Sequence, residues 1–465
     1  MEQHLKQIAV NVKYEYEEGR LSGVILATLV VEKVPVPVLE KNVELFFLPL
    51  TLQLVNDDSK KCREAVANCL SSMLRRLPTD LVKRLYDFAY RWSQGKVETR
   101  RASVQLFVIF VDSRETFMKR GETASQLVWR LTSILANHSK DDADWETLYF
   151  SLICLEKLAK LFPQFLAGRH KLWSVIAECL AHCHPFVKIV SLRLINQHLG
   201  SLDAALFAED GSNTFLVKKC GSLYEIARNI CFQLNSEEDH QSDEVTALCI
   251  ASLSWLLPAM DSHPSLCYAT NEQNDGNDES MDKKTTPVAW VMKRLSSMAK
   301  PRGPKRRQAV FKAFGAFANK CPALLVPHLE LVLESLHRVD VETIYNLEKP
   351  AHATSQLQKR RNDGPNAVAD DSIPGEAALA RDVMRLLEEQ CDPPGRFLEA
   401  YAAVKSRARD KKEQRKLEVN SEAVRDPKAA AKRRQQEHER GKNRKKRRVE
   451  DSRHKRGGIS KRHYY

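Results

Sequence analysis

Glycine is scarce in this sequence, with 17 residues among 465. A β-rich fold with many tight turns uses more glycine than this, so the low content favours a helical protein. The sequence contains no GxxxxGK[ST] loop and no GxGxxG fingerprint after a predicted strand. Because such loops bind the phosphates of nucleotides, their absence argues against the common nucleotide-dependent enzymes. No Ser/His/Asp or Cys/His arrangement stands out, so we expect a non-enzymatic protein with no cofactor and no metal.

Paired cysteines and long apolar segments are also lacking. The 11 cysteines include no CxxC pair, and most lie at apolar helical positions, as do Cys62, Cys69, Cys154 and Cys249. Buried free thiols of this kind are typical of a reducing compartment. The longest apolar run, Val24–Val31, is too short to cross a bilayer. The first residues do not resemble a signal peptide, so we expect a soluble intracellular protein without a membrane partner.

The positive charge is distributed unevenly along the chain. The whole sequence has a formal net charge of +13. Residues 401–465 contain 24 Lys and Arg against 9 Asp and Glu, a net charge of +15. The first 400 residues contain 49 basic and 51 acidic residues, a net charge of −2. A nearly neutral body is therefore followed by a strongly basic tail, which indicates a polyanionic partner or a targeting signal.

The segment Val43–Leu77 contains the pattern that the rest of the body repeats. Two apolar stripes at helical spacing flank Asn56-Asp57-Asp58, where an aspartate is expected to cap the second helix. Two antiparallel helices cannot bury both stripes alone, so neighbouring pairs must stack on them. This segment is typical of one HEAT-type repeat. The stripes consist of Val43, Phe47, Leu50 and Leu54 on the first helix and Cys62, Ala65, Val66, Cys69, Met73 and Leu77 on the second.

Further copies of the second-helix pattern follow at intervals of roughly 40 to 60 residues, as in HEAT-like repeats. An additional helical pair is expected in residues 1–34, turning around Glu17-Glu18-Gly19. We therefore predict an all-α HEAT/armadillo-like α-solenoid, with an irregular helical bundle as the alternative. The copies lie at Val97–Val111, Glu146–Leu161, His184–Leu199, Asp243–Leu257 and Pro304–Ala318.

Composition also predicts the domain organisation. Residues 1–341 should form the repeats, with a solvated polar loop at about 270–284. Periodicity fades over residues 342–373, where we expect a disordered linker, and returns as a helix over residues 374–392. Residues 396–465 form the basic C-terminal tail. Because this tail has almost no apolar stripe, it is expected to be disordered when free or to lie as an extended helix on something acidic.

The basic tail is the candidate functional site. Lys432–Arg434 and Arg444–Arg448 are separated by nine residues, near the spacing of a bipartite nuclear-import signal. The same cations would neutralise phosphates and release counterions from a nucleic acid. RNA contact, nuclear import and a merely solvated tail are the three alternatives, and the first two are compatible. The candidate residues are Lys411, Lys412, Arg415, Lys416, Lys432, Arg433, Arg434, Arg444, Lys445, Lys446, Arg447 and Arg448.

Three other features have simpler interpretations. His182-Cys183-His184 contains metal-binding residue types, but adjacent residues on a helix diverge, so it is interpreted as the turn before the next helix. Asp141–Asp144 precedes a predicted helix start at Trp145, where carboxylates favour capping. The remaining feature is a set of tryptophans within apolar patterns, which are interpreted as core residues rather than base-stacking groups. They are Trp129, Trp145, Trp173, Trp255 and Trp290.

Three segments together resemble the C-terminal end of the U3 small nucleolar RNA-associated protein 20 family, also called the DRIM family. They are Phe47–Arg63, His184–Leu199, and the stretch from Asp426-Pro427 through Lys432-Arg433 to Arg448. The sequence departs from the family at Phe186-Val187-Lys188, where a tryptophan-containing run is expected. The resemblance covers roughly residues 40–450, but only the end of the much longer chains of this family.

The resemblance implies a non-catalytic, nucleolar HEAT-repeat scaffold of the small-subunit processome. Its expected partners are ribosomal precursor RNA, the small nucleolar RNP, other processome proteins and an import receptor. It would act in small-subunit rRNA processing. The rival hypothesis is a nuclear HEAT-repeat transport or protein-docking adaptor whose basic tail is only an import signal.

Overall fold

The computed structural model describes most of the chain as α-helix, with no β-strand among the described residues. The chain divides into two compact units, Met1–Cys391 and Asp392–Tyr465. The described residues are 2–119, 121–138, 144–166, 168–204, 207, 214–234, 243–267, 286–299, 304–347, 375–390, 395–428, 431–432, 435–436, 438–439 and 442.

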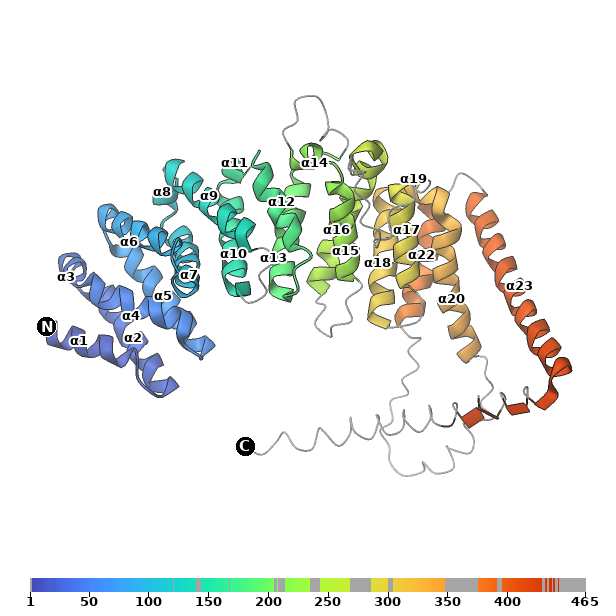
Figure 1. The fold of residues 1–465 in the computed structure, drawn as a ribbon, viewed down its shortest axis with the longest axis horizontal. Helices are drawn as coiled ribbons and strands as arrows, with labels where there is room; N and C mark the ends of the chain where they lie inside the picture. Colours follow the sequence, from blue (N-terminus) through green and yellow to red (C-terminus); the bar gives the residue numbers. More distant parts are fainter. Residues whose placement is uncertain are drawn as a thin grey trace. The chain divides into compact units, whose positions relative to one another are not determined.

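The first unit is a series of antiparallel helix pairs, and each pair contributes one helix to each of two layers (Figure 1). The first-layer helices are α1 (Glu2–Asn11), α4 (Val43–Asn56), α6 (Thr79–Trp92), α9 (Gly121–His138), α12 (His170–Cys179), α15 (Ser222–Leu234), α17 (Pro287–Met298) and α20 (Leu329–Leu347). The second-layer helices are α2 (Glu17–Lys33), α5 (Lys60–Arg76), α7 (Val97–Ser113), α10 (Trp145–Leu161), α13 (Pro185–Gly200), α16 (Asp243–Ser262), α18 (Pro304–Lys320) and α22 (Gly375–Gln390).

Each second-layer helix packs on the next second-layer helix along the chain, from α2 to α22. Short helices connect some of the pairs. They are α3 (Val36–Lys41), α8 (Glu115–Met118), α11 (Pro163–Leu166), α14 (Phe215–Lys218), α19 (Pro322–Leu325), and the 3-10 turns η2 (Pro264–Cys267) and η3 (Val326–His328). Because the pairs bury their apolar faces against one another, the core is continuous along the array.

The predicted all-α solenoid is confirmed, and most predicted repeat helices coincide with α4, α5, α7, α10, α13, α16 and α18. The first turn lies at residues 12–16, earlier than predicted, because Glu17 and Glu18 occupy the first turn of α2, where acidic side chains are favourable. At the other end, α20 continues to Leu347, and α22 packs on α18 and α20 as part of the array. Residues 348–374 and the polar loop at 270–284 lie outside the described residues.

The cap of α5 is Ser59 rather than an aspartate, so the capping prediction for this segment was wrong. The Ser59 hydroxyl accepts a hydrogen bond from the Cys62 amide at 3.3 Å. Asp57 instead accepts from the Ser59 amide at 2.9 Å and forms an ion pair with Arg20 of α2 at 2.8 Å. The Asp57 side chain is therefore engaged in joining two repeats, which sequence spacing alone could not show.

The Arg20–Asp57 contact is one of a series along the second layer. In each case an arginine of one helix pairs with a carboxylate at or shortly before the N-terminal end of the next second-layer helix, and within the first turn the helix dipole also favours negative charge. Three of the four carboxylates are buried, and the exception is Glu244. The pairs are Arg20–Asp57 at 2.8 Å, Arg101–Asp144 at 3.0 Å, Arg193–Glu244 at 2.7 Å and Arg307–Glu376 at 3.0 Å.

Arginines also join the C-terminal ends of neighbouring second-layer helices. Arg76 of α5 donates to the carbonyls of Val31 and Val34 at the end of α2, the latter at 2.8 Å. Arg114, directly after α7, donates in the same way to Leu74 at 2.6 Å and to Leu77. The last carbonyls of a helix have no partner within the helix and carry partial negative charge. These guanidinium groups therefore stabilise the C-terminal ends of α2 and α5.

One helix among the described residues, α16, is long and apolar enough to cross a membrane by those two criteria alone. In the structure it packs on α13, α15 and α18, and Leu253, Leu256 and Leu257 are fully buried. Its Ser252 hydroxyl lies 3.1 Å from the Asn196 amide of α13. These contacts place α16 in the core of the array.

The ten cysteines in the described part of the chain are free thiols, and eight of them are buried. Burial raises the pKa of the Cys69 thiol to about 11 and those of Cys179 and Cys231 to about 12. These thiols therefore remain protonated at neutral pH and pack as small apolar side chains, as the sequence predicted for Cys69.

Replacing a core leucine tests the packing of α5. Leu70 is fully buried, so Leu70→Asp should destabilise the array by about 3 to 5 kcal/mol because it buries an unpaired carboxylate. Leu52→Asp is the matched control, since Leu52 of α4 is 42% exposed. Thermal melting followed by circular dichroism measures the stability of both variants. An equal melting midpoint would contradict the assignment of Leu70 to the buried face of α5.

Removing the buried charge at Asp57 tests the contact between repeats. Burial tends to raise the pKa of Asp57, but hydrogen bonds from Arg20 and the Ser59 amide outweigh it and hold the pKa below its ordinary value of 3.8. The ion pair therefore stabilises the fold fully above that pH, and this stabilisation is lost as the pH falls through the lowered pKa. Asp57→Asn should lower the melting temperature at pH 7 more than Asp58→Asn does.

The neighbouring Asp58 is exposed, so Asp58→Asn is the control for replacing a carboxylate with an amide. The difference between the two variants should shrink when melting is repeated near pH 3. A difference that stays constant between pH 7 and pH 3 would show that charge at Asp57 is not the cause.

Candidate nucleic-acid interface

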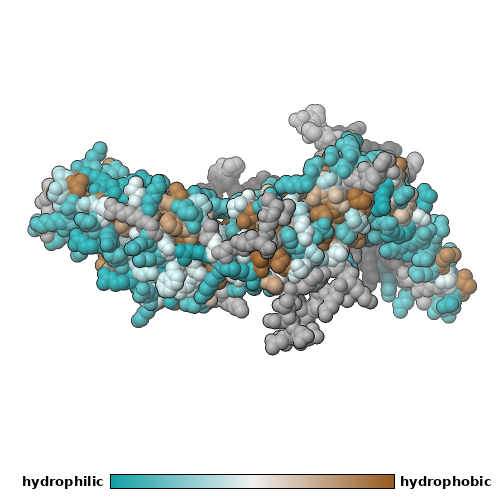
Figure 2. Space-filling view, turned by 90° about the horizontal axis from the view of Figure 1, so that it is seen from above, coloured by the Kyte–Doolittle hydropathy of each residue, from teal (hydrophilic) through white to brown (hydrophobic). Residues whose placement is uncertain are grey.

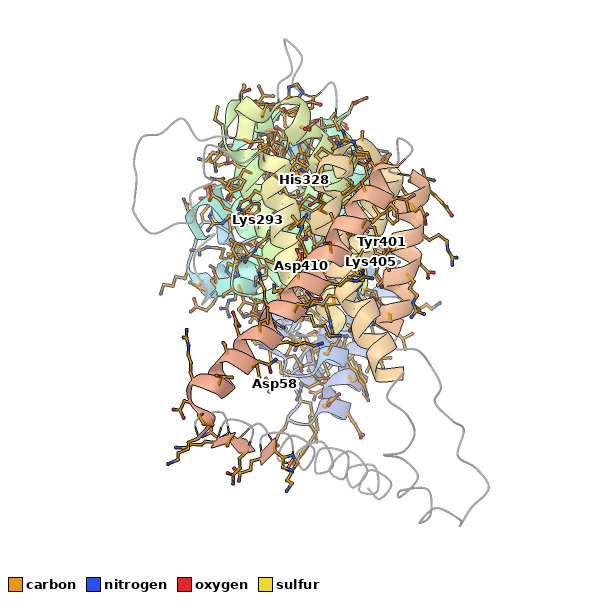
Figure 3. The ribbon with its side chains drawn as sticks, turned by 90° about the vertical axis from the view of Figure 1, so that its right-hand side faces the viewer. Asp58, Lys293, His328, Tyr401, Lys405 and Asp410 are labelled. Carbon is orange, nitrogen blue, oxygen red and sulfur yellow. The ribbon has the colours of Figure 1, made fainter. Side chains whose placement is uncertain are left out.

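The described part of the second unit consists mainly of one long helix, α23 (Arg396–Arg425). Its sequence contains strong helix formers such as Ala, Lys, Arg, Glu and Gln, with no glycine or proline between its ends. Figure 3 shows Tyr401, Lys405 and Asp410 along this helix, and the Lys405 ammonium lies 4.2 Å from the centre of the Tyr401 ring. From Lys405 to Ser421 every residue is exposed.

Five of the predicted site residues lie within the described chain. Lys411, Lys412, Arg415 and Lys416 lie on α23, and Lys432 lies at a helical position beyond it, and all five are exposed. The remaining candidates lie outside the described residues, and for them the prediction stands on the sequence. They are Arg433, Arg434, Arg444, Lys445, Lys446, Arg447 and Arg448.

The cations of α23 form two stripes along the helix. Residues four and three positions apart share a face of an α-helix, which turns about 100° per residue. One stripe consists of Lys405, Arg409, Lys412 and Lys416, and the other consists of Arg407, Lys411 and Arg415. Asp410 and Glu413 project from the remaining side. The helix therefore presents seven cations over roughly 17 Å, at about 1.5 Å per residue.

Four of these cations have no ion-pair partner among the described residues of their own unit. They are Lys411, Lys412, Arg415 and Lys416. Several lie four residues from another cation, as Lys411 does from Arg415 and Lys412 from Lys416, and like charges at this spacing destabilise a helix. An external polyanion would relieve this repulsion, so the arrangement favours phosphate binding.

The predicted cap after this helix is confirmed. Asp426 lies outside the helix, and its carboxylate accepts a hydrogen bond from the Lys428 amide at 3.1 Å. Pro427 occupies the first position of the following helical segment, where its missing amide hydrogen is not needed. The basic sequence after Asp426 thus begins as a separate helical segment.

The His182-Cys183-His184 segment forms an aromatic contact and a local hydrogen bond. His184 precedes α13 and stacks on Trp145 of α10, with ring centroids 3.8 Å apart. The His182 ring nitrogen lies 3.0 Å from the His184 amide. His184 is thus the residue directly before α13 and Pro185 is the first residue of that helix, which agrees with the predicted turn before it. Within the described residues, no three His, Cys, Asp or Glu side chains are placed to hold a metal ion.

A cavity of about 610 Å³ lies between α11, α12, α13 and α14. Trp173, Phe207 and Phe215 are among the residues that line it. His198 stacks on Trp173 at 3.9 Å, and burial lowers the pKa of His198 to about 4, so its ring is neutral at physiological pH. This cavity suits an apolar group better than a phosphate.

One tryptophan of the body differs from the sequence interpretation. Trp129 of α9 is 60% exposed, so its assignment to the core was wrong, whereas Trp173 is buried as predicted. Apolar periodicity shows that a residue belongs to a helix, but it does not show which tryptophan faces solvent.

The charge of the body is less uniform than its total implies. Residues 61–120 contain 13 basic and 6 acidic residues. In this stretch Lys83, Arg84 and Arg91 are exposed on α6.

Comparison with known proteins agrees with the resemblance found in the sequence. The chain is 23% identical over 207 residues to U3 small nucleolar RNA-associated protein 20 of Saccharomyces cerevisiae, a match covering 44% of this chain and 8% of the relative. It is also 23% identical over 212 residues to the protein of that name from Schizosaccharomyces pombe, covering 43% of this chain and 8% of the relative. Over part of its length, the chain is therefore similar to members of the U3 small nucleolar RNA-associated protein 20 family.

The matches to U3 small nucleolar RNA-associated protein 20 span only a small part of each yeast protein. No protein-family model matches the chain. Among solved structures, that of Kap121p bound to Pho4p is similar over 87% of this chain and 39% of Kap121p, with 13% identity and a TM-score of 0.35.

The repulsion between cations on α23 can be tested in a peptide of residues 396–428. Lys412→Glu should raise its helicity at low salt, because a glutamate four residues before Lys416 forms a favourable pair in place of a repulsive one. Lys412→Gln is the control, since it removes the charge without creating a pair. Circular dichroism should rank the peptides as Glu above Gln above Lys, and the differences should diminish in 1 M salt. An unchanged helicity would contradict the repulsion.

Proposed function

We propose that this chain is a non-catalytic scaffold of pre-ribosomal particles that binds ribosomal precursor RNA through its basic tail. The body would bind assembly proteins of the small-subunit processome and the small nucleolar RNP, in the nucleolus, during small-subunit rRNA processing. The proposal rests on the family relationship and on the charge of α23. The yeast relatives are named for their association with the U3 small nucleolar RNA.

The observation that carries the RNA-binding proposal is the row of exposed cations between Lys405 and Lys416. Phosphates along an RNA backbone are repeated negative charges, and a rigid helix with cations on two stripes can bind several of them at once. Each phosphate that is neutralised releases condensed counterions, so the binding should be strong at low salt and weak at high salt. Lysine and arginine on phosphates carry no base information, so this contact orients the RNA without selecting its sequence.

Recognition of particular assembly partners would then fall to the body. The first unit presents two layers of helices, and stacked repeats of this kind provide extended surfaces for protein partners. The tail clusters outside the described residues would add RNA contacts and bind an import receptor. In the alternative function, a nuclear transport or docking adaptor, the tail serves import alone and the chain binds no RNA.

A salt titration of RNA binding tests the proposal. Replacing Lys411, Lys412, Arg415 and Lys416 with glutamine should weaken binding of single-stranded RNA by the whole chain. It should also reduce the slope of log affinity against log salt by about 3 units, because each phosphate contact on a single strand contributes about 0.7. A scrambled RNA sequence should bind equally well. Filter binding or fluorescence anisotropy measures these affinities.

The matched control removes four exposed cations from the most basic part of the body. Replacing Lys83, Arg84, Arg91 and Lys96 with glutamine changes the net charge equally and should leave the slope within one unit of the original. An equal reduction of the slope in both variants would show that the body also binds RNA. Absence of RNA binding by the intact chain at moderate salt would favour the import-only alternative.

A further inference from the structure

Two neighbouring second-layer helices, α10 and α13, share an exposed aromatic surface. Phe186 of α13 is 52% exposed, and its ring centroid lies 6.0 Å from that of Trp145 and 5.8 Å from that of Tyr149, both on α10. Neither helix is at an end of the array, because α7 packs on α10 and α16 packs on α13. In the view of Figure 2, hydrophilic residues cover most of the visible surface and hydrophobic residues form separate patches. Rings grouped at such a surface indicate a contact with another molecule.

Half-buried apolar side chains extend this surface along both helices. Tyr149 and Ile153 follow Trp145 at four-residue spacing on α10, and Ile189 follows Phe186 on the next turn of α13. At about 1.5 Å per residue, the distance along α10 from Trp145 to Ile153 is about 12 Å. We call these five residues the aromatic strip.

The aromatic strip is held in place from behind. The His184 ring stacks on Trp145 with the two ring planes 6° apart. Leu148 and Leu152 of α10 and Val187 of α13 are fully buried, so neither helix can turn its part of the strip inward. The strip is therefore a stable feature of the folded array.

Two hydrogen-bond donors in the aromatic strip are unused. Neither the indole N–H of Trp145 nor the hydroxyl of Tyr149 forms a hydrogen bond within the described part of the chain, and neither polar atom is buried. In Trp173 and Trp255, by contrast, the indole N–H donates to a backbone carbonyl at 3.0 and 2.8 Å. The strip can therefore donate hydrogen bonds to a ligand as well as bury its apolar groups.

The charged residues at the two ends of the strip are paired. Arg101 lies 3.4 Å from Glu146 at one end, and Arg193 lies 2.7 Å from Glu244 at the other. The two carboxylate side chains are 36% and 53% exposed and would repel the phosphates of RNA. Lys188 lies two residues, or about 200° of helix rotation, from Phe186, so it projects from another side of α13. The strip thus favours an uncharged ligand.

An extended proline-rich segment fits these features better than a helix or a strand does. The carbonyls of an α-helix are bonded within the helix, and an added β-strand needs the edge of a sheet. A polyproline II segment has no internal hydrogen bonds, so its carbonyls can accept from exposed side chains while its proline rings pack on aromatic rings. At 3.1 Å per residue, about four residues of such a segment span the strip.

We propose that the aromatic strip binds an uncharged, proline-rich segment of a partner protein in the polyproline II conformation. Proline rings pack on Phe186 and Tyr149, and the indole N–H of Trp145 and the hydroxyl of Tyr149 donate to carbonyls of the segment. A contact of about four residues is far smaller than a standard protein interface, so the dissociation constant should be on the order of 100 μM. This contact does not rest on RNA binding by α23, so either proposal can fail without the other.

Fluorescence anisotropy of a labelled decaproline peptide, titrated with the whole chain, tests this proposal. Decaproline should bind at least about tenfold more tightly than a Gly/Ser peptide of the same length, which is a flexible coil. Phe186→Ser should weaken decaproline binding at least about tenfold, because it removes a ring from the centre of the contact. Phe232→Ser is the matched control and should leave binding unchanged, since Phe232 of α15 is 45% exposed and lies in another repeat.

Removing one donor provides the sharper test. Tyr149→Phe keeps the ring and removes only the hydroxyl, so it should weaken decaproline binding about fivefold. Circular dichroism verifies that each variant is folded. Equal binding of decaproline and the Gly/Ser peptide overturns the proposal, and so does decaproline binding that Phe186→Ser or Tyr149→Phe leaves unchanged. A uridine oligonucleotide that loses affinity with Phe186→Ser, and that decaproline does not displace, would show that the strip binds nucleobases and would also overturn it.

Discussion

The array depends on the requirement that each second-layer helix between α2 and α22 be covered on two flanks, one by the preceding pair and one by the following pair. Apolar packing satisfies most of this requirement, as for α7, where seven apolar residues are buried. Polar contacts then fix the relative position of successive pairs. The ion pair between Arg20 and Asp57 acts at the start of the helices, and the hydrogen bonds from Arg76 act at their ends. With both ends joined, one helix cannot slide along the next without breaking several charged hydrogen bonds.

The fold could be predicted from the sequence because apolar periodicity is a local property. Cys62, Val66, Cys69 and Met73 lie on one face of any α-helix, and the structure buries all four. The pairing of Asp57 with Arg20 could not be predicted, since it joins residues 37 positions apart and depends on how two repeats stack. Ser59 provides the cap of α5 because it lies directly before the helix, whereas Asp57 ends α4 two residues earlier.

The sequence predicted which segment carries the charge of the candidate site, but not how the charged side chains are arranged on its surface. Sequence composition identified Lys411, Lys412, Arg415 and Lys416, and the continuous helix α23 arranges them on two stripes with Asp410 on the remaining side. Only a regular helix produces this separation of charge. The exposure of Trp129 was missed for a related reason, because a tryptophan within an apolar pattern can lie at the edge of the stripe, where the next pair does not reach. The nearly neutral net charge of the first 400 residues likewise gave no indication that residues 61–120 are basic.

The buried cysteines have a consequence for how this chain responds to chemical stress and for how its motions can be observed. A thiol such as Cys231, with a pKa of about 12, contains almost no thiolate and reacts with oxidants or alkylating agents only when its repeat opens. Cys69, Cys179 and Cys231 belong to three different helix pairs. Since repeats in such arrays can open separately, each thiol is a natural reporter for one section of the molecule, and its rate of modification records the local opening of that section.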